Sequence, residues 1–161
     1  LKGIPPALLK GAHAVAVIPR VVKAGFVIGG RVGFGALFVR TETGAWAEPT
    51  FIRLGGASVG FQAGVQSADV VLVFRNRDTV DRLLRGKGKL TLGADAAVAA
   101  GPLGRRAEAG TDARLSAEIL SYSRARGLFA GVSLGGAVIQ PADEMNREYR
   151  DRADRPETVQ A

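Results

Sequence analysis

The chain has 161 residues, which is enough for one domain with a hydrophobic core. It carries a formal net charge of +7 and 22 glycines, a glycine share about twice the usual one. It has no cysteine and one histidine, which excludes disulfides, zinc–thiolate sites, thiol nucleophiles and multi-histidine metal sites.

The N-terminal half predicts a short helix followed by strands. Residues 4–12 are typical of an amphipathic helix with a proline in its first turn. Apolar alternation predicts four strands after it, at residues 13–18, 26–40, 46–53 and 57–65. We expect Pro19 to end the first of these strands, the glycines near residues 33–35 to interrupt the second, and a turn at residues 43 and 44 to lead into the third.

The C-terminal half opens on the strongest strand signal. Residues 70–74 (VVLVF) are apolar at every position, which predicts a central strand covered on both faces. Asn76 is placed to cap a helix that runs to about Arg85 and stops at Gly86. The remaining predictions are an apolar segment at 90–100, a hairpin formed by 115–123 and 128–139, and a terminal helix at 143–150.

Glycine recurs at a spacing of four in three segments, at positions 25, 29 and 33, at 56, 60 and 64, and at 127, 131 and 135. The residues between them alternate with period two, which favours strands over membrane helices packed through GxxxG. Each such strand would have one apolar face and one nearly bare face. A bare face suits tight curvature or an element packed directly on the backbone.

These patterns predict an α+β fold: a curved, mostly antiparallel, glycine-rich sheet or half-barrel with a few short helices packed on it. We expect one domain over residues 1–150. Residues 151–161 have the composition of a flexible charged tail.

Basic residues gather in two stretches. Residues 1–41 hold six basic and no acidic side chains, and residues 75–89 hold six basic and two acidic ones. Residues 141–161 reverse the balance with six acids and four arginines, so the rest of the chain carries +9. This excess of positive charge favours an anionic partner. The alternative is that the basic residues form an ordinary solvated surface without a partner. Lipid is favoured over nucleic acid because no RNA-stacking motif, zinc finger or clear recognition helix is present.

Catalytic motifs are weak. The pattern GxSxG occurs at residues 56–60 and 131–135, but both matches lie in glycine-periodic strand segments, and His13 precedes both. We expect His13 to pack in the fold, Asp69 and Asp95 to cap or pair, and residues 101–106 to form a turn. No enzyme activity, cofactor or metal is predicted.

The run SYSRARGLFAGVSL at residues 121–134 resembles the hallmark segment of the SYLF-domain family, the lipid- and actin-binding domain of yeast and animal endocytic proteins and of many bacterial proteins. Further segments agree in order: IP at 4–5, KAGF at 23–26, GAW at 44–46, GFQAG at 60–64, LTLGAD at 90–95 and GPLGR at 101–105. The resemblance spans about residues 4–149. Over this range the sequence is more similar to bacterial members of the family than to eukaryotic ones. His13 and Gly135 depart from it, standing where the family usually has a glycine and an acid.

The resemblance implies a non-enzymatic binding module, because eukaryotic members bind phosphoinositides and some bind actin. A bacterial member would keep acidic lipid as its partner. Many bacterial members are exported and some are lipoproteins, so we expect an exported, periplasmic or membrane-associated protein, with any N-terminal signal or anchor upstream of residue 1. The helical segment that precedes the domain in the family would also lie upstream of residue 1. A structural or protein-interaction domain is the alternative. The residues expected to bind lipid are Lys10, Arg20, Lys23, Arg31, Arg82, Arg85, Lys87 and Lys89.

Overall fold

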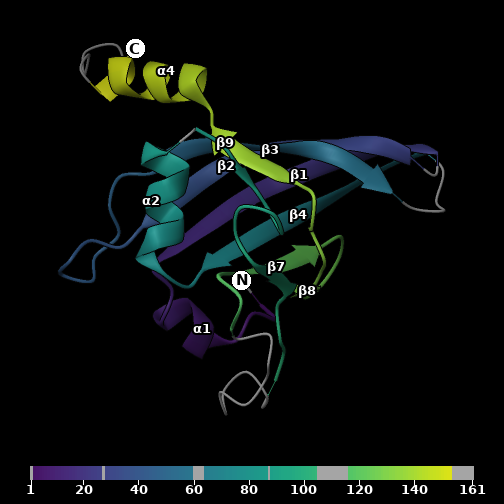
Figure 1. Ribbon diagram of the computed structural model, residues 1–161, viewed down its shortest axis with the longest axis horizontal. Helices are drawn as coiled ribbons and strands as arrows, with labels where there is room; N and C mark the ends of the chain where they lie inside the picture. The colour runs from purple at the N-terminus through teal and green to yellow at the C-terminus, as the bar shows by residue number, and fades with distance from the viewer. Residues whose placement is uncertain (1, 27, 60–63, 87, 105–115, 154–161) are drawn as a thin grey trace.

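The computed structural model describes residues 2–26, 28–59, 64–86, 88–104 and 116–153. They form one curled sheet with short helices packed on it (Figure 1). The strands are β1 (Ala14–Phe26), β2 (Ile28–Val39), β3 (Thr50–Val59), β4 (Gly64–Phe74), β5 (Leu90–Thr91), β6 (Val98–Ala100), β7 (Ile119–Arg124), β8 (Ala130–Gly131) and β9 (Val138–Pro141). The helices are α1 (Pro6–Lys10), α2 (Arg77–Arg85) and α4 (Asp143–Ala153).

The strand order across the sheet is β5-β9-β3-β2-β1-β4-β7-β6, and β8 pairs with β7. Every pair of these strands is antiparallel except β6 with β7. The predicted α+β fold with a curved, mostly antiparallel sheet is therefore confirmed.

The sheet is covered on both faces where β4 crosses its centre. Val70, Leu72 and Phe74 belong to a core cluster that includes Val80 and Leu83 of α2. The alternate residues of β4, at positions 71 and 73, belong to a second cluster with Leu8 of α1. Helices α1 and α2 thus pack on opposite faces, and the predicted doubly covered strand is confirmed.

The helix ends follow their sequence signals. Asn76 Oδ1 accepts a hydrogen bond from the Thr79 backbone N–H at 3.0 Å, which satisfies one of the free donors at the start of α2. Gly86 follows the last residue of that helix. Pro6 opens α1, where its missing N–H costs nothing. Helix α4 continues past Arg150 to Ala153.

The prediction that Pro19 ends the first strand is wrong. Strand β1 continues to Phe26, and its pairing shifts register between Val17 and Val22 against β2 and between Ile18 and Val21 against β4. The shift is a β-bulge in which Arg20 has a positive φ of 53°. A bulge lets the strand accept a proline that cannot donate to the ladder, because the chain bends there and resumes pairing beyond it.

Three other strand boundaries differ from expectation. Strand β2 runs without a break through its glycines. The strand predicted at residues 57–65 is divided between the end of β3, at Val59, and the start of β4, at Gly64, and residues 60–63 lie outside the described part of the chain. Residues 128–139 are not one strand either, because β8 is followed by a turn in which Gly136 has φ +90°, and β9 then pairs with β3 instead of β7.

Gly33 and Gly35 of β2 face the core. A Cβ on Gly33 would lie 2.8 Å from Val21 Cγ2 and 3.0 Å from Ile18 Cγ2. Both neighbours flank the bulge of β1, so the bulged strand packs directly on the bare backbone of β2. Val32 and Phe34 alternate with these glycines and therefore point away from the core, where they are 39% and 48% exposed.

Candidate functional site

The eight residues predicted to bind lipid lie in separate parts of the fold. Lys10 ends α1 on one face of the sheet, whereas Arg82 and Arg85 belong to α2 on the other. Arg20 is exposed at the bulge of β1, and Arg31 is half-buried on β2.

The three remaining residues of the eight are Lys23, Lys87 and Lys89. Lys23 lies opposite Arg31 in the ladder, but its side chain lies outside the described part of the structure. Lys87 also lies outside the described residues, and Lys89 is exposed just after α2. The eight positions therefore do not form one patch.

Arg82 is engaged within the protein. Its guanidinium lies 2.8 Å from Glu118 Oε1 and 3.3 Å from Asp78 Oδ2, and it donates to the carbonyl of Asp95. Glu118 in turn accepts from the backbone N–H of Ala97 at 2.7 Å. This network ties α2 to the segments before β6 and β7, so Arg82 is the least available of the predicted cations.

Asp69 connects the bulge to β7. Its Oδ1 accepts from the Arg20 backbone N–H at 3.1 Å, and its Oδ2 accepts from Arg124 Nη2 at 3.0 Å. These two hydrogen bonds hold the pKa of the Asp69 carboxyl below its usual range, against a smaller opposing effect of burial. Asp95 accepts from the Thr91 backbone N–H in a turn. The expectation that both aspartates cap or pair is confirmed.

Replacing Asp69 by asparagine should lower the free energy of unfolding at pH 7 by about 1 to 2 kcal/mol, because a charged acceptor becomes neutral. The lowered folded-state pKa means that the carboxylate stabilises the fold fully above the unfolded pKa and loses this effect as the pH falls through the folded value. Urea unfolding of both proteins at pH 7 and near pH 3 should therefore show the difference shrinking at the lower pH. A difference that is the same at both pH values would contradict this assignment.

The structure contains an exposed apolar surface that the sequence did not predict. Val22, Val32 and Phe34 are 38%, 39% and 48% exposed. Val22 and Val32 are direct cross-strand partners, and Phe34 pairs with Arg53 of β3. We call Val22, Val32 and Phe34 the apolar patch. The alternation along β2 was visible in the sequence, but it did not show which face would point outward.

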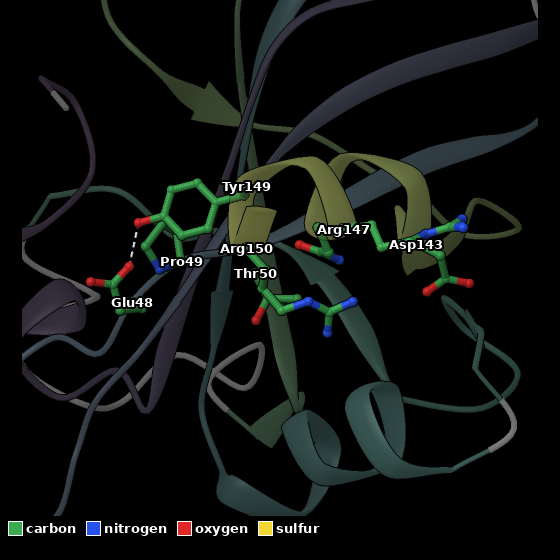
Figure 2. Close-up of a pocket in the computed structure, with 8 residues that line it drawn as sticks. Glu48, Pro49, Thr50, Asp143, Arg147, Tyr149 and Arg150 are labelled. Atoms are coloured by element: carbon green, nitrogen blue, oxygen red, sulfur yellow. Dashed lines mark hydrogen bonds between the residues drawn. The ribbon is translucent and has the colours of Figure 1, made fainter. Parts of the chain in front are cut away.

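A groove lies between α4 and the start of β3, with a volume of about 760 Å³ (Figure 2). Asn146 anchors the helix, because its side chain accepts from the Phe51 backbone N–H at 2.6 Å and donates to the Phe51 carbonyl at 3.0 Å. Tyr149 packs edge-on against Phe51 and donates from its hydroxyl to Glu48, which raises the pKa of Tyr149. The lining residues are Glu48, Pro49, Thr50, Asp143, Asn146, Arg147, Tyr149 and Arg150.

A second groove of about 500 Å³ shares Glu48 and Thr50 with the first and extends towards α2. His13 lines it and is half-buried, with its backbone hydrogen-bonded to Phe74 and Arg40, so the expected packing of His13 is confirmed. Cationic and acidic side chains are mixed in both grooves, so neither has one sign of charge.

Neither GxSxG match has the setting of a catalytic serine. Ser133 is exposed and lies between β8 and β9, and Ser58 lies within β3, so no helix follows either one directly. Among the described residues, no three His, Asp or Glu side chains gather in a way that could hold a metal ion. None of the helices in the described part of the chain is long and apolar enough to cross a membrane.

Comparison with known proteins points to one family. The family model described as "Ysc84: Las17-binding protein actin regulator" matches residues 55–157. An SH3 domain-containing protein of Schizosaccharomyces pombe is 43% identical over 150 residues, which cover 91% of this chain and 34% of that protein. LAS seventeen-binding protein 3 of Saccharomyces cerevisiae is 40% identical over 148 residues, covering 91% of this chain and 32% of its own length.

SH3 domain-containing YSC84-like protein 1 of Xenopus laevis is 38% identical over 153 residues, covering 95% of this chain and 45% of that protein. The chain therefore spans about a third of the length of the two yeast proteins and under half of the frog protein. No solved structure matches the chain.

Proposed function

Since the chain belongs to the Ysc84 family, whose SYLF domain the run at residues 121–134 predicted, we propose that it is a non-enzymatic binding module for anionic membrane surfaces. Its relatives are named as Las17-binding and SH3 domain-containing proteins and not as enzymes. The observation that carries the lipid proposal is charge: residues 1–41, which form α1, β1 and β2, hold six basic and no acidic side chains. Each basic residue near an anionic leaflet contributes ~1 kcal/mol.

The N-terminal cations are better placed for this role than those around α2. Lys10 and Arg20 are exposed and lie in the stretch that lacks acids. The α2 cations lie among acids instead, because Arg77 is 3.8 Å from Asp81 and Arg82 pairs with Asp78 and Glu118. A flat membrane cannot reach helices on opposite faces of one sheet together, so we assign binding to the N-terminal group.

Vesicle co-sedimentation tests the proposal. The chain should bind phosphatidylcholine vesicles that contain phosphatidylserine, bind pure phosphatidylcholine much less, and lose binding at high salt. The variant K10Q/R20Q should bind anionic vesicles about 10-fold to 30-fold more weakly, at ~1 kcal/mol per charge removed. R85Q/K89Q removes the same charge from the other group and should stay within about threefold of wild type. Equal binding to both kinds of vesicle, or binding to neither, would refute the proposed binding to anionic membrane surfaces.

The alternative is a protein-interaction domain, and the names of the relatives favour it, because LAS seventeen-binding proteins are named for a protein partner. The groove between α4 and the start of β3 offers such a partner a hollow surface with both charge signs. Co-sedimentation with actin filaments or binding to purified Las17, together with no binding to anionic vesicles, would select this function.

A further inference from the structure

We infer that the apolar patch of Val22, Val32 and Phe34 inserts into the interfacial region of an anionic bilayer, so that the α1 face of the sheet is the membrane-facing surface. This inference rests on the proposed function and deepens it. It names the face of the sheet that contacts the lipid. It also adds insertion of apolar side chains to the attraction between charges, which by itself would hold the protein only at the membrane surface.

The patch belongs to the same face of the sheet as α1. Val15 and Val17 of β1 contribute to the cluster that α1 covers, and they pair with Phe38 and Ala36 of β2. Side chains two residues apart along a strand share a face, so Phe34 and Val32 continue this face beyond the reach of α1. Val22 joins them as the direct partner of Val32.

Small residues leave the patch flat and accessible. Val32 pairs with Gly55 on β3, and Val22 pairs with the exposed Ser67 on β4. Gly30 continues the patch face along β2 without a side chain. Three clustered large apolar side chains that no described element covers are the kind of surface that marks an interaction site, whereas singly exposed apolar residues are normal.

Cations border the patch, and the strands that form it carry no acid. Arg53 pairs with Phe34, and its guanidinium folds over Gly55, with Nη1 3.4 Å from where a Cβ on that glycine would lie. Lys10 extends from α1 on the same face. Residues 1–41 and 49–68 contain no acidic residue, and Asp69, the first acid of β4, is paired with Arg124.

This charge pattern selects an anionic bilayer over a second copy of the chain. A symmetric dimer built on the patch would bring Arg53 and its equivalent to the same interface without an opposing carboxylate from these strands. An anionic leaflet supplies the missing charge and accepts apolar side chains at the boundary of headgroups and acyl chains, as it does for interfacial amphipathic elements.

The test compares V32T/F34T with M145Q in vesicle co-sedimentation. Threonine keeps β propensity while removing apolar surface, so V32T/F34T should bind phosphatidylserine-containing vesicles at least about 10-fold more weakly. Met145 of α4 is 36% exposed and lies outside the patch, so M145Q should bind as wild type does. Circular dichroism checks that each variant is folded.

Fluorescence quenching supplies an independent readout of insertion. The chain contains one tryptophan, Trp46, so the double variant F34W/W46F carries a single indole within the patch. Lipids brominated on their acyl chains should quench the fluorescence of F34W/W46F in anionic vesicles. They should quench Trp46 of the wild type less, because Trp46 lies outside the patch and stacks at 4.1 Å on Arg40 in the connection between β2 and β3.

The outcomes separate the two proposals. If wild type binds anionic vesicles but V32T/F34T binds equally well and F34W/W46F is not quenched, the insertion is refuted and the charge-based function stands. If wild type does not bind anionic vesicles, the proposed function itself fails. A dimer in light scattering that V32T/F34T abolishes would assign the patch to a second copy and overturn the bilayer assignment.

Discussion

Alanine in place of Gly35 is expected to destabilise the fold by about 3 kcal/mol, the upper part of the range for inserting a group into a packed interior. The added Cβ would meet the carbonyl oxygen of Val17 and lie 2.6 Å from the Cα of Ile18. Both are backbone atoms of β1, which is held by β2 on one side and β4 on the other. The collision therefore cannot be relieved by turning a side chain.

Gly30 provides the matched control on the same strand. A Cβ there would meet only the carbonyl oxygen of Gly56, at an ordinary 3.9 Å. Gly30→Ala should therefore leave stability unchanged or raise it by about 0.5 kcal/mol, because alanine restricts the unfolded chain. Urea unfolding of the two variants beside wild type measures both effects. Similar stabilities for the two variants would show that β1 does not press on Gly35.

The contrast between these glycines also shows where reading of the sequence succeeded and where it failed. The period-two alternation of β2 correctly predicted a bare face and an apolar face. The alternation could not show that the bare face would point into the core. That orientation depends on contact with the bulge of β1 after Pro19, which lies in a different strand. Pro19 was interpreted as the end of a strand, although a bulge satisfies the same missing donor.

The repeated spacing of glycine has no single cause. Gly127 has a φ of +71° in a turn, a Cβ on Gly131 would collide with the backbone of Gly101, and a Cβ on Gly135 would meet open space. Local signals were more reliable. The apolar run at β4 and the Asn76 cap depend on their own sequence, so both were predicted correctly.

The candidate site was predictable in its charge and not in its geometry. The clustering of cations in residues 1–41 was visible in the sequence. The engagement of Arg82 with Glu118 was not, because the two residues lie 36 positions apart and meet only once α2 packs against β4 and β9. The apolar patch was missed for a related reason: exposed and buried apolar strand faces have the same alternation.

The segment by which the family was identified has a structural role. Ser121 donates its hydroxyl to the Val132 carbonyl at 2.6 Å, and Arg124 pairs with Asp69 and lies over the ring of Phe129 at 4.6 Å. Tyr122 is fully buried. The run at residues 121–134 therefore identifies the fold directly, whereas the binding surface must be located from charge and exposure.

Replacing Tyr122 by alanine is expected to cost about 4 kcal/mol, as for other large aromatic side chains removed from a core. The ring lies against Gly101, where even a Cβ would overlap it, and the hydroxyl donates to the Pro102 carbonyl at 2.8 Å. Tyr122→Phe keeps the ring and removes this one donor, so it should cost about 1 to 2 kcal/mol. Thermal and urea unfolding of both variants measure the two contributions.

Vesicle binding by the same variants separates a structural tyrosine from a ligand-binding one. Because the ring and hydroxyl of Tyr122 are fully buried, Tyr122→Phe should be less stable than wild type and yet bind anionic vesicles equally well per folded molecule. A tyrosine that contacted ligand would show the reverse, with stability retained and binding lost. That result would move the binding surface to β7 and away from the α1 face of β1 and β2. The run at residues 121–134 would then form the binding site itself, instead of the part of the fold that supports the binding site.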